Sequence, residues 1–220
     1  MIRVKICGVT SIADAEVACQ AGADLIGLNF YEKSPRRVSE ADARKIRTAL
    51  TRTVEAVGIF VNAAPSEIVR ICRSLRLDAA QLHGDESPET VNLVAREIRV
   101  FKALHVNANF ALDSLEKYSP ASAFLLDAAR SSQYGGTGQT IDWSLARRAA
   151  ATHHIILAGG LKPENVATAI RAVRPYAVDV ASGVESEPGK KDHAKVRQFI
   201  QEVRRAEKQL EAQAEKSNAL

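Results

Sequence analysis

Eight short apolar runs alternate along this chain with amphipathic segments of about 10 to 15 residues. This alternation constrains the fold most, because it is typical of βα units arranged around a parallel sheet. Eight units within 220 residues predict a single-domain α/β protein, a (β/α)8 TIM barrel at the small end of its size range. The predicted strands are residues 4–7, 25–30, 56–61, 79–83, 100–104, 123–127, 155–158 and 177–181.

Helix signals between the runs support the same fold. Ser87 and Pro88 have the pattern of an N-cap followed by proline in the first turn, and Pro65 begins another predicted helix. An open doubly wound sheet usually has fewer strands, and no G-x-G-x-x-G motif follows the first strand. The predicted helices are residues 11–21, 39–50, 65–75, 87–96, 110–118, 143–151, 163–173 and 192–208.

Length and composition favour one domain. Hydrophobic residues make up 46% of the chain, which is enough for one sizeable core. We expect residues 1–203 to form the catalytic barrel and the charged residues 204–220 to form a helical extension or tail. No apolar run approaches the roughly 20 residues that span a bilayer, and Met1 begins directly in a strand pattern. These features predict no membrane partner.

Cysteine usage and charge narrow the class of protein further. Cys7, Cys19 and Cys72 lack CxxC spacing, which argues against a disulfide framework or a zinc site and for a cytoplasmic location. The net charge is +4, and the basic residues lie on predicted helix faces interleaved with acids. Because no basic cluster contains the aromatic residues of a stacking platform, we expect no nucleic-acid partner.

Polar residues and glycines collect where the predicted strands end. In a barrel the active site is built at the carboxyl ends of the strands. A purely structural barrel has no reason for such a pattern, so the strand ends predict an active site. The residues concerned are Cys7-Gly8, Asn29-Phe30, Val61-Asn62, Gln81 to Gly84, Leu126-Asp127, Ala158 to Gly160 and Ala181 to Gly183.

The first strand ends in Cys7, directly before Gly8 and a predicted helix. Position alone leaves open that Cys7 is simply a small buried hydrophobe, as most free cysteines are. Side chains alternate along a strand, so Lys5 and Cys7 face the same side, and the eighth strand brings Asp179 alongside. We expect Lys5 and Asp179 to pair, because a lone buried lysine would be destabilising. Lys5 is the one obvious cation that the sequence places near Cys7.

Glycine-rich loops predict a phosphate site. Many barrels hold phosphate with backbone N–H groups of the loops after the seventh and eighth strands. The glycine-rich loop after the sixth strand would add further N–H donors. The candidate residues are Gly159 and Gly160 after the seventh strand, Ser182 and Gly183 after the eighth, and Gly136 and Gly138 after the sixth.

Taken in order, these motifs resemble the phosphoribosylanthranilate isomerase family of tryptophan biosynthesis. The Gly-Gly loops alone are shared with other phosphate-binding barrels, but the combination is specific. Only the charged tail after about residue 204 lies outside the family pattern. The matching segments are residues 5–8, 27–30, 34–36, 58–62, 81–84, 125–127, 135–138, 157–161, 163–166, 179–185 and 188–192.

The resemblance implies a ribulose-phosphate-binding barrel that acts on a phosphosugar. The reaction is the Amadori rearrangement of N-(5'-phosphoribosyl)anthranilate to 1-(2-carboxyphenylamino)-1-deoxyribulose 5-phosphate. In the family the cysteine of the first strand is the general base and the aspartate ending the sixth is the general acid, roles that fall on Cys7 and Asp127. The arginine of the Ser-Pro-Arg loop, here Arg36, holds the anthranilate carboxylate. No metal or cofactor is implied, because the iminium intermediate is itself an electron sink.

Two further residues, His83 and Asp179, are candidates for substrate binding, and the sequence leaves two roles possible for each. His83 is either a proton shuttle or a hydrogen-bonding histidine beside the site. Asp179 either orients the substrate or neutralises Lys5. Both a monomer and a homodimer are compatible with the sequence.

Other phosphosugar barrels and a non-catalytic phosphate sensor are the competing interpretations. An indole-glycerol-phosphate synthase would need an acidic and lysine set that these strand ends lack. A ribulose-phosphate epimerase would need paired acids and usually metal ligands. A sensor would need the phosphate loops but no cysteine and aspartate facing one cavity. The combination of Cys7 and Asp127 therefore favours the isomerase.

Overall fold

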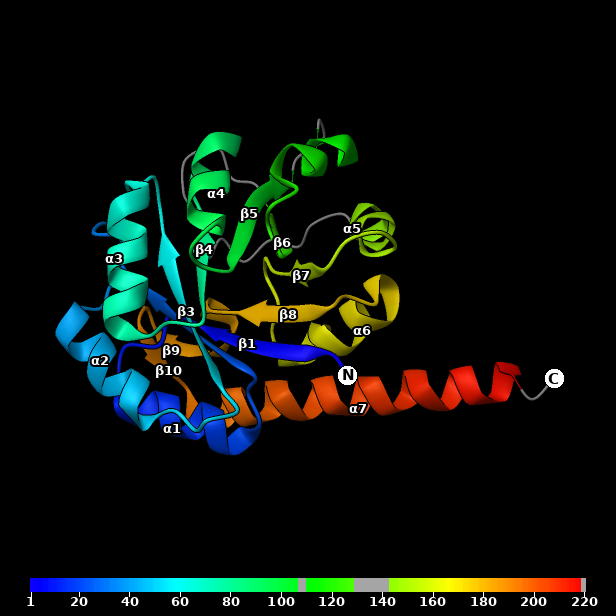
Figure 1. The fold of residues 1–220 in the computed structure, drawn as a ribbon. Coiled ribbons are helices and arrows are strands. Elements are labelled where there is room, and N and C mark those ends of the chain that lie inside the picture. The colour runs from blue at the N-terminus through cyan, green and yellow to red at the C-terminus, as the bar shows by residue number, and fades with distance from the viewer. Residues whose placement is uncertain (107–109, 129–142, 219–220) are drawn as a thin grey trace.

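The computed structural model describes residues 1–106, 110–128 and 143–218, and within them eight parallel strands close into a barrel. The strands follow in order from β1 to β8, and β1 and β8 pair at the seam (Figure 1). The predicted TIM barrel is confirmed. The strands are β1 Arg3–Cys7, β2 Leu25–Asn29, β3 Glu55–Phe60, β4 Ala79–Leu82, β5 Val100–Val106, β6 Ala123–Ala128, β7 Ile155–Leu157 and β8 Ala177–Val180.

Helices cover the outside of the barrel (Figure 1), and three of them begin with a serine cap, which the sequence predicted at Ser87. The side chains of Ser11, Ser39 and Ser87 each accept a hydrogen bond from the backbone N–H three residues further on. This contact satisfies one of the free N–H groups of a helix start. The helices are α1 Ile12–Ala21, α2 Glu40–Ala49, α3 Pro65–Leu75, α4 Pro88–Ala95, α5 Trp143–Ala150, α6 Pro163–Val173 and α7 His193–Asn218.

One predicted helix differs in type. Residues 110–118 were expected to be helical, but Leu112–Tyr118 forms a 3-10 helix, η1. Leu115 is its one buried residue. Because the stability of an α-helix in a protein comes mainly from packing an apolar face, so short a segment adopts the tighter 3-10 form.

The last helix, α7, continues past the predicted end at residue 208 and extends beyond the barrel (Figure 1). Within it, Arg204 donates hydrogen bonds to the carbonyl oxygen of Ile2 at 2.6 Å and to Asp24 at 2.8 Å. The helix is therefore tied to the start of the chain. The expected boundary between residues 203 and 204 falls inside this helix and stays a prediction. None of the helices in the described ranges is long and apolar enough to cross a membrane.

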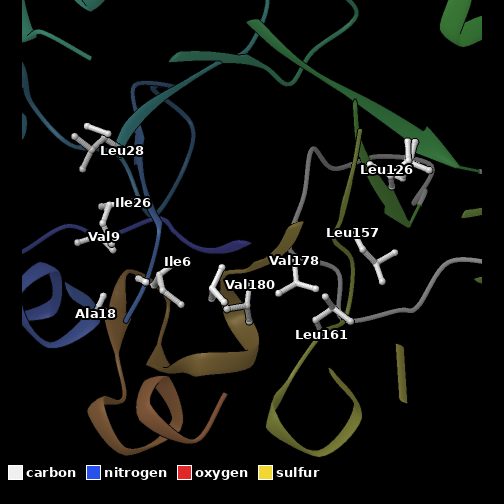
Figure 2. Close-up of a cluster of buried hydrophobic side chains, with 14 of the residues drawn as sticks. Ile6, Val9, Ala18, Ile26, Leu28, Leu126, Leu157, Leu161, Val178 and Val180 are labelled. Carbon is white, nitrogen blue, oxygen red and sulfur yellow. The ribbon is translucent and has the colours of Figure 1, made fainter. Parts of the chain in front are cut away.

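Alternation along the strands divides the apolar core into two layers. Val57, Phe101 and Ile156 belong to a cluster that fills the barrel interior. A larger cluster packs the outer face of the strands against the helices. Figure 2 shows part of this outer layer, where Ile6 of β1 and Val180 of β8 lie near one another. Polar side chains that point into the barrel interior are therefore candidate active-site residues.

A short hairpin that the sequence did not predict lies beyond β8. After the 3-10 turn η2 (Ser182–Val184), β9 (Glu185–Glu187) pairs antiparallel with β10 (Lys190–Lys191). The carbonyl oxygen of Gly189, at the hairpin turn, accepts a hydrogen bond from Thr10 Oγ1 at 2.5 Å. A Cβ on Gly189 would lie only 2.9 Å from the carbonyl oxygen of Pro35. The hairpin is thus seated on the loops that follow β1 and β2.

A buried ion pair between Lys102 and Glu86, on the outer face of the barrel strands, fixes the turn after β4. Lys102 of β5 is 1% exposed, and its Nζ donates to Glu86 at 2.8 Å and to the carbonyl oxygen of Gly84 at 2.7 Å. Glu86 in turn accepts from the backbone N–H of Asn62 at 2.9 Å and of Gly84 at 3.0 Å. The backbone on both sides of His83 is therefore held by charged hydrogen bonds.

Replacing Lys102 with methionine should destabilise the fold. Lys102→Met leaves the Glu86 carboxylate buried without its cation, which costs about 3–5 kcal/mol of unfolding free energy. Urea denaturation followed by circular dichroism measures this loss. Lys117→Met, at an exposed lysine of η1, should change stability by less than about 0.5 kcal/mol. A loss below about 1 kcal/mol for Lys102→Met would contradict the structural role assigned to the pair.

Candidate active site

Charged and polar side chains gather where the barrel strands end. Pairing between strands aligns Lys5 with Asp179 across the β1–β8 seam, and His105 with Asp127 across β5 and β6. A small cleft at this rim is lined by residues that the sequence analysis selected: Asp127, Gly159, Gly160, Asp179 and Ser182. The predicted acid and most of the described phosphate-loop residues thus share one cleft.

Lys5 and Asp179 form the predicted pair. Lys5 Nζ lies 2.8 Å from Asp179 Oδ1, and the Lys5 side chain is fully buried. Burial alone would lower the pKa of Lys5, but the neighbouring Asp179 carboxylate and Cys7 thiol outweigh it and raise that pKa above its usual value. Lys5 is therefore a permanent positive charge at the barrel mouth.

Cys7 lies half-buried beside this pair and next to a second cation. Burial is the main cause that raises the pKa of the Cys7 thiol, and the Asp179 carboxylate raises it further. Lys5 and Lys191 oppose this and favour the thiolate. Lys191 of β10 was quoted in the family motif but was given no role, because the sequence does not reveal that the hairpin folds back over β1.

Arg36 is held over the first strand by two features. Gly8 has a φ of +70°, and a Cβ there would lie 2.5 Å from Arg36 Cδ, so only glycine leaves room for the arginine. Arg36 Nε and Nη2 donate to the two oxygens of Glu185 at 2.9 and 2.7 Å. This bidentate contact uses one edge of the guanidinium group, and the Nη1–Nη2 edge is not used by Glu185. Sequence reasoning missed Glu185.

His83 is a buried, neutral histidine. Burial is the main cause that lowers its pKa to about 3, and the neighbouring His105, Lys5 and Lys102 add to the effect. His83 Nδ1 lies 2.7 Å from Gln81 Nε2, and Nε2 lies 3.8 Å from Asp127 Oδ2, beyond hydrogen-bond range. The low pKa of His83 and its contact with Gln81 favour a hydrogen-bonding role over that of a proton shuttle.

His105 is a further rim residue that sequence reasoning missed. Its ring packs edge-on against that of His83, with centroids 5.9 Å apart. The predicted strand stopped at Leu104, whereas β5 runs to Val106. The alternation of Phe101, Ala103 and His105 would have revealed its inward position.

The predicted phosphate loops adopt conformations that favour glycine. Gly159 and Gly160 have positive φ values of 80° and 63°. A Cβ on Gly183 would lie 1.9 Å from the carbonyl oxygen of Leu161, so the loops after β7 and β8 pack directly together. Gly136 and Gly138 lie outside the described residues. The two described loops leave room for backbone N–H groups to approach a ligand.

The low pKa of His83 predicts a pH-dependent stability. Between pH 3 and 6.5 the unfolded chain binds a proton that folded His83 excludes, so stability falls as pH drops below about 6.5. Between pH 7 and pH 5, wild type should lose about 2 kcal/mol more unfolding free energy than His83→Gln. Urea denaturation at both pH values measures this. His154→Gln, at an exposed histidine, should behave as wild type, and equal losses for His83→Gln and wild type would refute the prediction.

Comparisons with known proteins agree with this geometry. The family model described as N-(5'phosphoribosyl)anthranilate (PRA) isomerase matches residues 4–202. N-(5'-phosphoribosyl)anthranilate isomerase of Trichlorobacter lovleyi is 51% identical over 207 residues, covering 94% of this chain and all of the relative.

Solved structures agree in fold and sequence. A phosphoribosyl anthranilate isomerase in complex with reduced 1-(o-carboxyphenylamino)-1-deoxyribulose 5-phosphate has a TM-score of 0.83 and 41% identity, covering 93% of this chain and 99% of that one. Monomers generated from the dimeric enzyme of Thermotoga maritima have a TM-score of 0.81 and 42% identity, with the same coverage of 93% and 99%. The chain therefore belongs to the N-(5'-phosphoribosyl)anthranilate isomerase family.

Proposed function

We propose that this chain catalyses the Amadori rearrangement of N-(5'-phosphoribosyl)anthranilate to 1-(2-carboxyphenylamino)-1-deoxyribulose 5-phosphate. One observation carries the proposal: a thiol, Cys7 at the end of β1, and a carboxyl group, Asp127 on β6, meet the same barrel mouth. Arg36 lies against Gly8 beside the thiol, and the glycines after β7 share a cleft with the carboxyl group. This arrangement supports acid–base chemistry on a phosphosugar that carries a carboxylate.

Asp127 is assigned the acid step. Its buried carboxyl group lies in the cleft beside Gly159 and Gly160. A phosphate held by the N–H groups of these loops would bring the ribose ring to Asp127. Transfer of the Asp127 proton to the ring oxygen lets the C1–O bond break while the nitrogen lone pair forms a C=N bond. The products are an open-chain iminium ion and a hydroxyl group.

Cys7 is assigned the base step. Its thiolate removes the proton from C2, and the electrons of the C–H bond flow into the iminium. The resulting enolamine tautomerises to the ketone. Because the iminium accepts the electrons, the step balances without a further oxidant or reductant. Only the thiolate is basic enough, so the charges around Cys7 decide how much of the enzyme is active.

Arg36 is assigned to the carboxylate of the anthranilate ring. Glu185 holds one edge of the guanidinium group, so the Nη1–Nη2 edge can meet a second carboxylate with two parallel hydrogen bonds. We assign Asp179 and His83 to substrate hydroxyl groups. Asp179 lines the cleft, and His83 Nε2 lies 3.8 Å from Asp127 Oδ2, so that one substrate hydroxyl group could contact both side chains.

We also propose a cytoplasmic location and either a monomeric or a homodimeric state. The three cysteines are free, which fits a reducing compartment. One structural neighbour derives from a dimeric isomerase, so the homodimer is the first state to test.

Removing either reacting group should abolish turnover while binding persists. Cys7→Ser and Asp127→Asn should each lower kcat by at least about 10²- to 10⁴-fold, because each removes a proton-transfer group. A fluorescence assay of substrate loss measures kcat, and calorimetry with the reduced product analogue measures binding. Cys19→Ser and Asp113→Asn are the matched controls and should keep wild-type turnover. Near wild-type kcat in either test variant removes that residue from its assigned role.

Replacing Arg36 with lysine should weaken substrate binding. Arg36→Lys keeps the positive charge but loses the planar fork that serves Glu185 and the substrate together, so KM should rise about 10- to 100-fold. The same fluorescence assay gives KM and kcat separately. Arg37→Lys, at the neighbouring, largely exposed arginine, should leave KM unchanged. An unaltered KM for Arg36→Lys would show that the carboxylate binds elsewhere.

A further inference from the structure

The β9–β10 hairpin carries two buried charges that the proposed steps do not use. Lys191 Nζ lies 2.9 Å from Glu185 Oε1, and their side chains are 0% and 4% exposed. A buried ion pair is a poor source of stability, because desolvation offsets much of the attraction. Its position at the active-site rim therefore calls for a functional explanation.

Lys191 lies near the end of β1, because it binds the backbone directly after β8, the strand that pairs with β1. The β1–β8 pairing ends with Ile6 opposite Val180, and Cys7 and Ala181 are the next residues along the two segments. Lys191 Nζ donates to the carbonyl oxygen of Ala181 at 3.2 Å. The ammonium group is thus anchored to the backbone that runs beside the thiol.

Glu185 fixes this ammonium group and Arg36 at the same time. Its Oε1 accepts from Lys191 Nζ and from Arg36 Nε, each at 2.9 Å, and Oε2 accepts from Arg36 Nη2. The backbone N–H of Gly189 also donates to Oε1, at 3.3 Å. One carboxylate therefore orients two cations, one from β10 and one from the loop after β2.

The charges that face Cys7 do not cancel. Lys5 of β1 is offset by Asp179 of β8. The remaining two cations, Lys191 and Arg36, share Glu185 as their carboxylate partner. Burial lowers the pKa of Lys191, whereas Glu185 and Cys7 raise it. While Lys191 is protonated, one positive charge is left over in this group, and a thiolate at Cys7 would neutralise it. Burial is the largest influence and raises the pKa of Cys7, whereas Lys5 and Lys191 lower it.

We propose that Lys191, held by Glu185, is a positioning residue that stabilises the Cys7 thiolate. The inference rests on the proposed function in so far as Cys7 is the base. Lys191 does not touch the reacting atoms, and it acts through the thiol. Glu185 keeps the ammonium group at the rim, where it favours the charged form of Cys7.

Alkylation of Cys7 tests this without substrate. The rate of reaction with iodoacetamide is measured from pH 6 to 10 and read for each cysteine peptide by mass spectrometry. In Lys191→Met the pH midpoint for Cys7 should move upward by about one pH unit, and alkylation near pH 7 should slow about tenfold. Cys19 serves as an internal standard whose rate should not change.

Matched variants separate charge from packing. Lys190→Met changes the adjacent, exposed lysine and should leave the Cys7 profile unchanged. Lys191→Arg keeps a cation and should restore most of the wild-type rate. Lys191→Met leaves Glu185 its contact with Arg36, so we expect it to fold, and thermal unfolding checks this. If Lys191→Met does not fold, Lys191→Gln replaces it, because glutamine is neutral but keeps a hydrogen-bond donor for Glu185.

An unchanged Cys7 profile in a folded neutral variant would overturn the proposal. So would an equal slowing in Lys191→Arg, because that would point to packing rather than charge. The alkylation assay involves no turnover, whereas the test of Cys7→Ser measures turnover and binding of the product analogue. Failure of the Lys191 proposal and failure of the proposed reaction are therefore distinguishable.

Discussion

The buried ion pair between Lys5 and Asp179 links the closure of the barrel to its chemistry. It spans the seam where the first strand meets the last, with 2.8 Å between the charged atoms. Either charge alone would be strongly destabilising in that position, so the two strands are held in one register. That register brings Ile6 opposite Val180, so Cys7 and Ala181 follow one residue later, and Lys191 of the hairpin after β8 donates to the carbonyl oxygen of Ala181. The same ion pair therefore fixes how the barrel closes and which residues surround the thiol.

Around this pair, the barrel strands carry the reacting groups, and residues outside the barrel strands hold the surrounding backbone and cations in place. Strands carry the groups assigned to the reaction, Cys7 and Asp127, and alternation fixes where they point. Buried carboxylates outside the barrel strands fix the backbone and the cations: Glu86 holds the turn after β4, and Glu185 of β9 holds Arg36. Each carboxylate is satisfied by several hydrogen bonds, which is the condition under which buried charge is tolerated.

Sequence reasoning reached the parts of this arrangement that local patterns encode. Strand alternation and the order of the strands were enough to pair Lys5 with Asp179, and start signals at Pro65 and Ser87 supported two of the helices that the apolar pattern predicted. The hairpin was missed because strands of two and three residues are too short to show a period. The roles of Glu185 and Lys191 were missed with it, since Arg36, which Glu185 holds, and Cys7, whose pKa Lys191 lowers, lie far away in the chain. His105 was lost to a strand boundary placed two residues early.

One positive charge acts on two titratable groups at the rim, in each case as a smaller influence than burial. Lys5 favours the charged form of the Cys7 thiol, and the same ammonium group disfavours the charged form of His83. An anionic thiolate and a cationic imidazolium respond oppositely to one field, so a cluster of cations favours a thiolate base beside a neutral histidine. Such a field also suits a ligand that carries a carboxylate at one end and a phosphate at the other. The charges that tune the base would thus also attract the substrate.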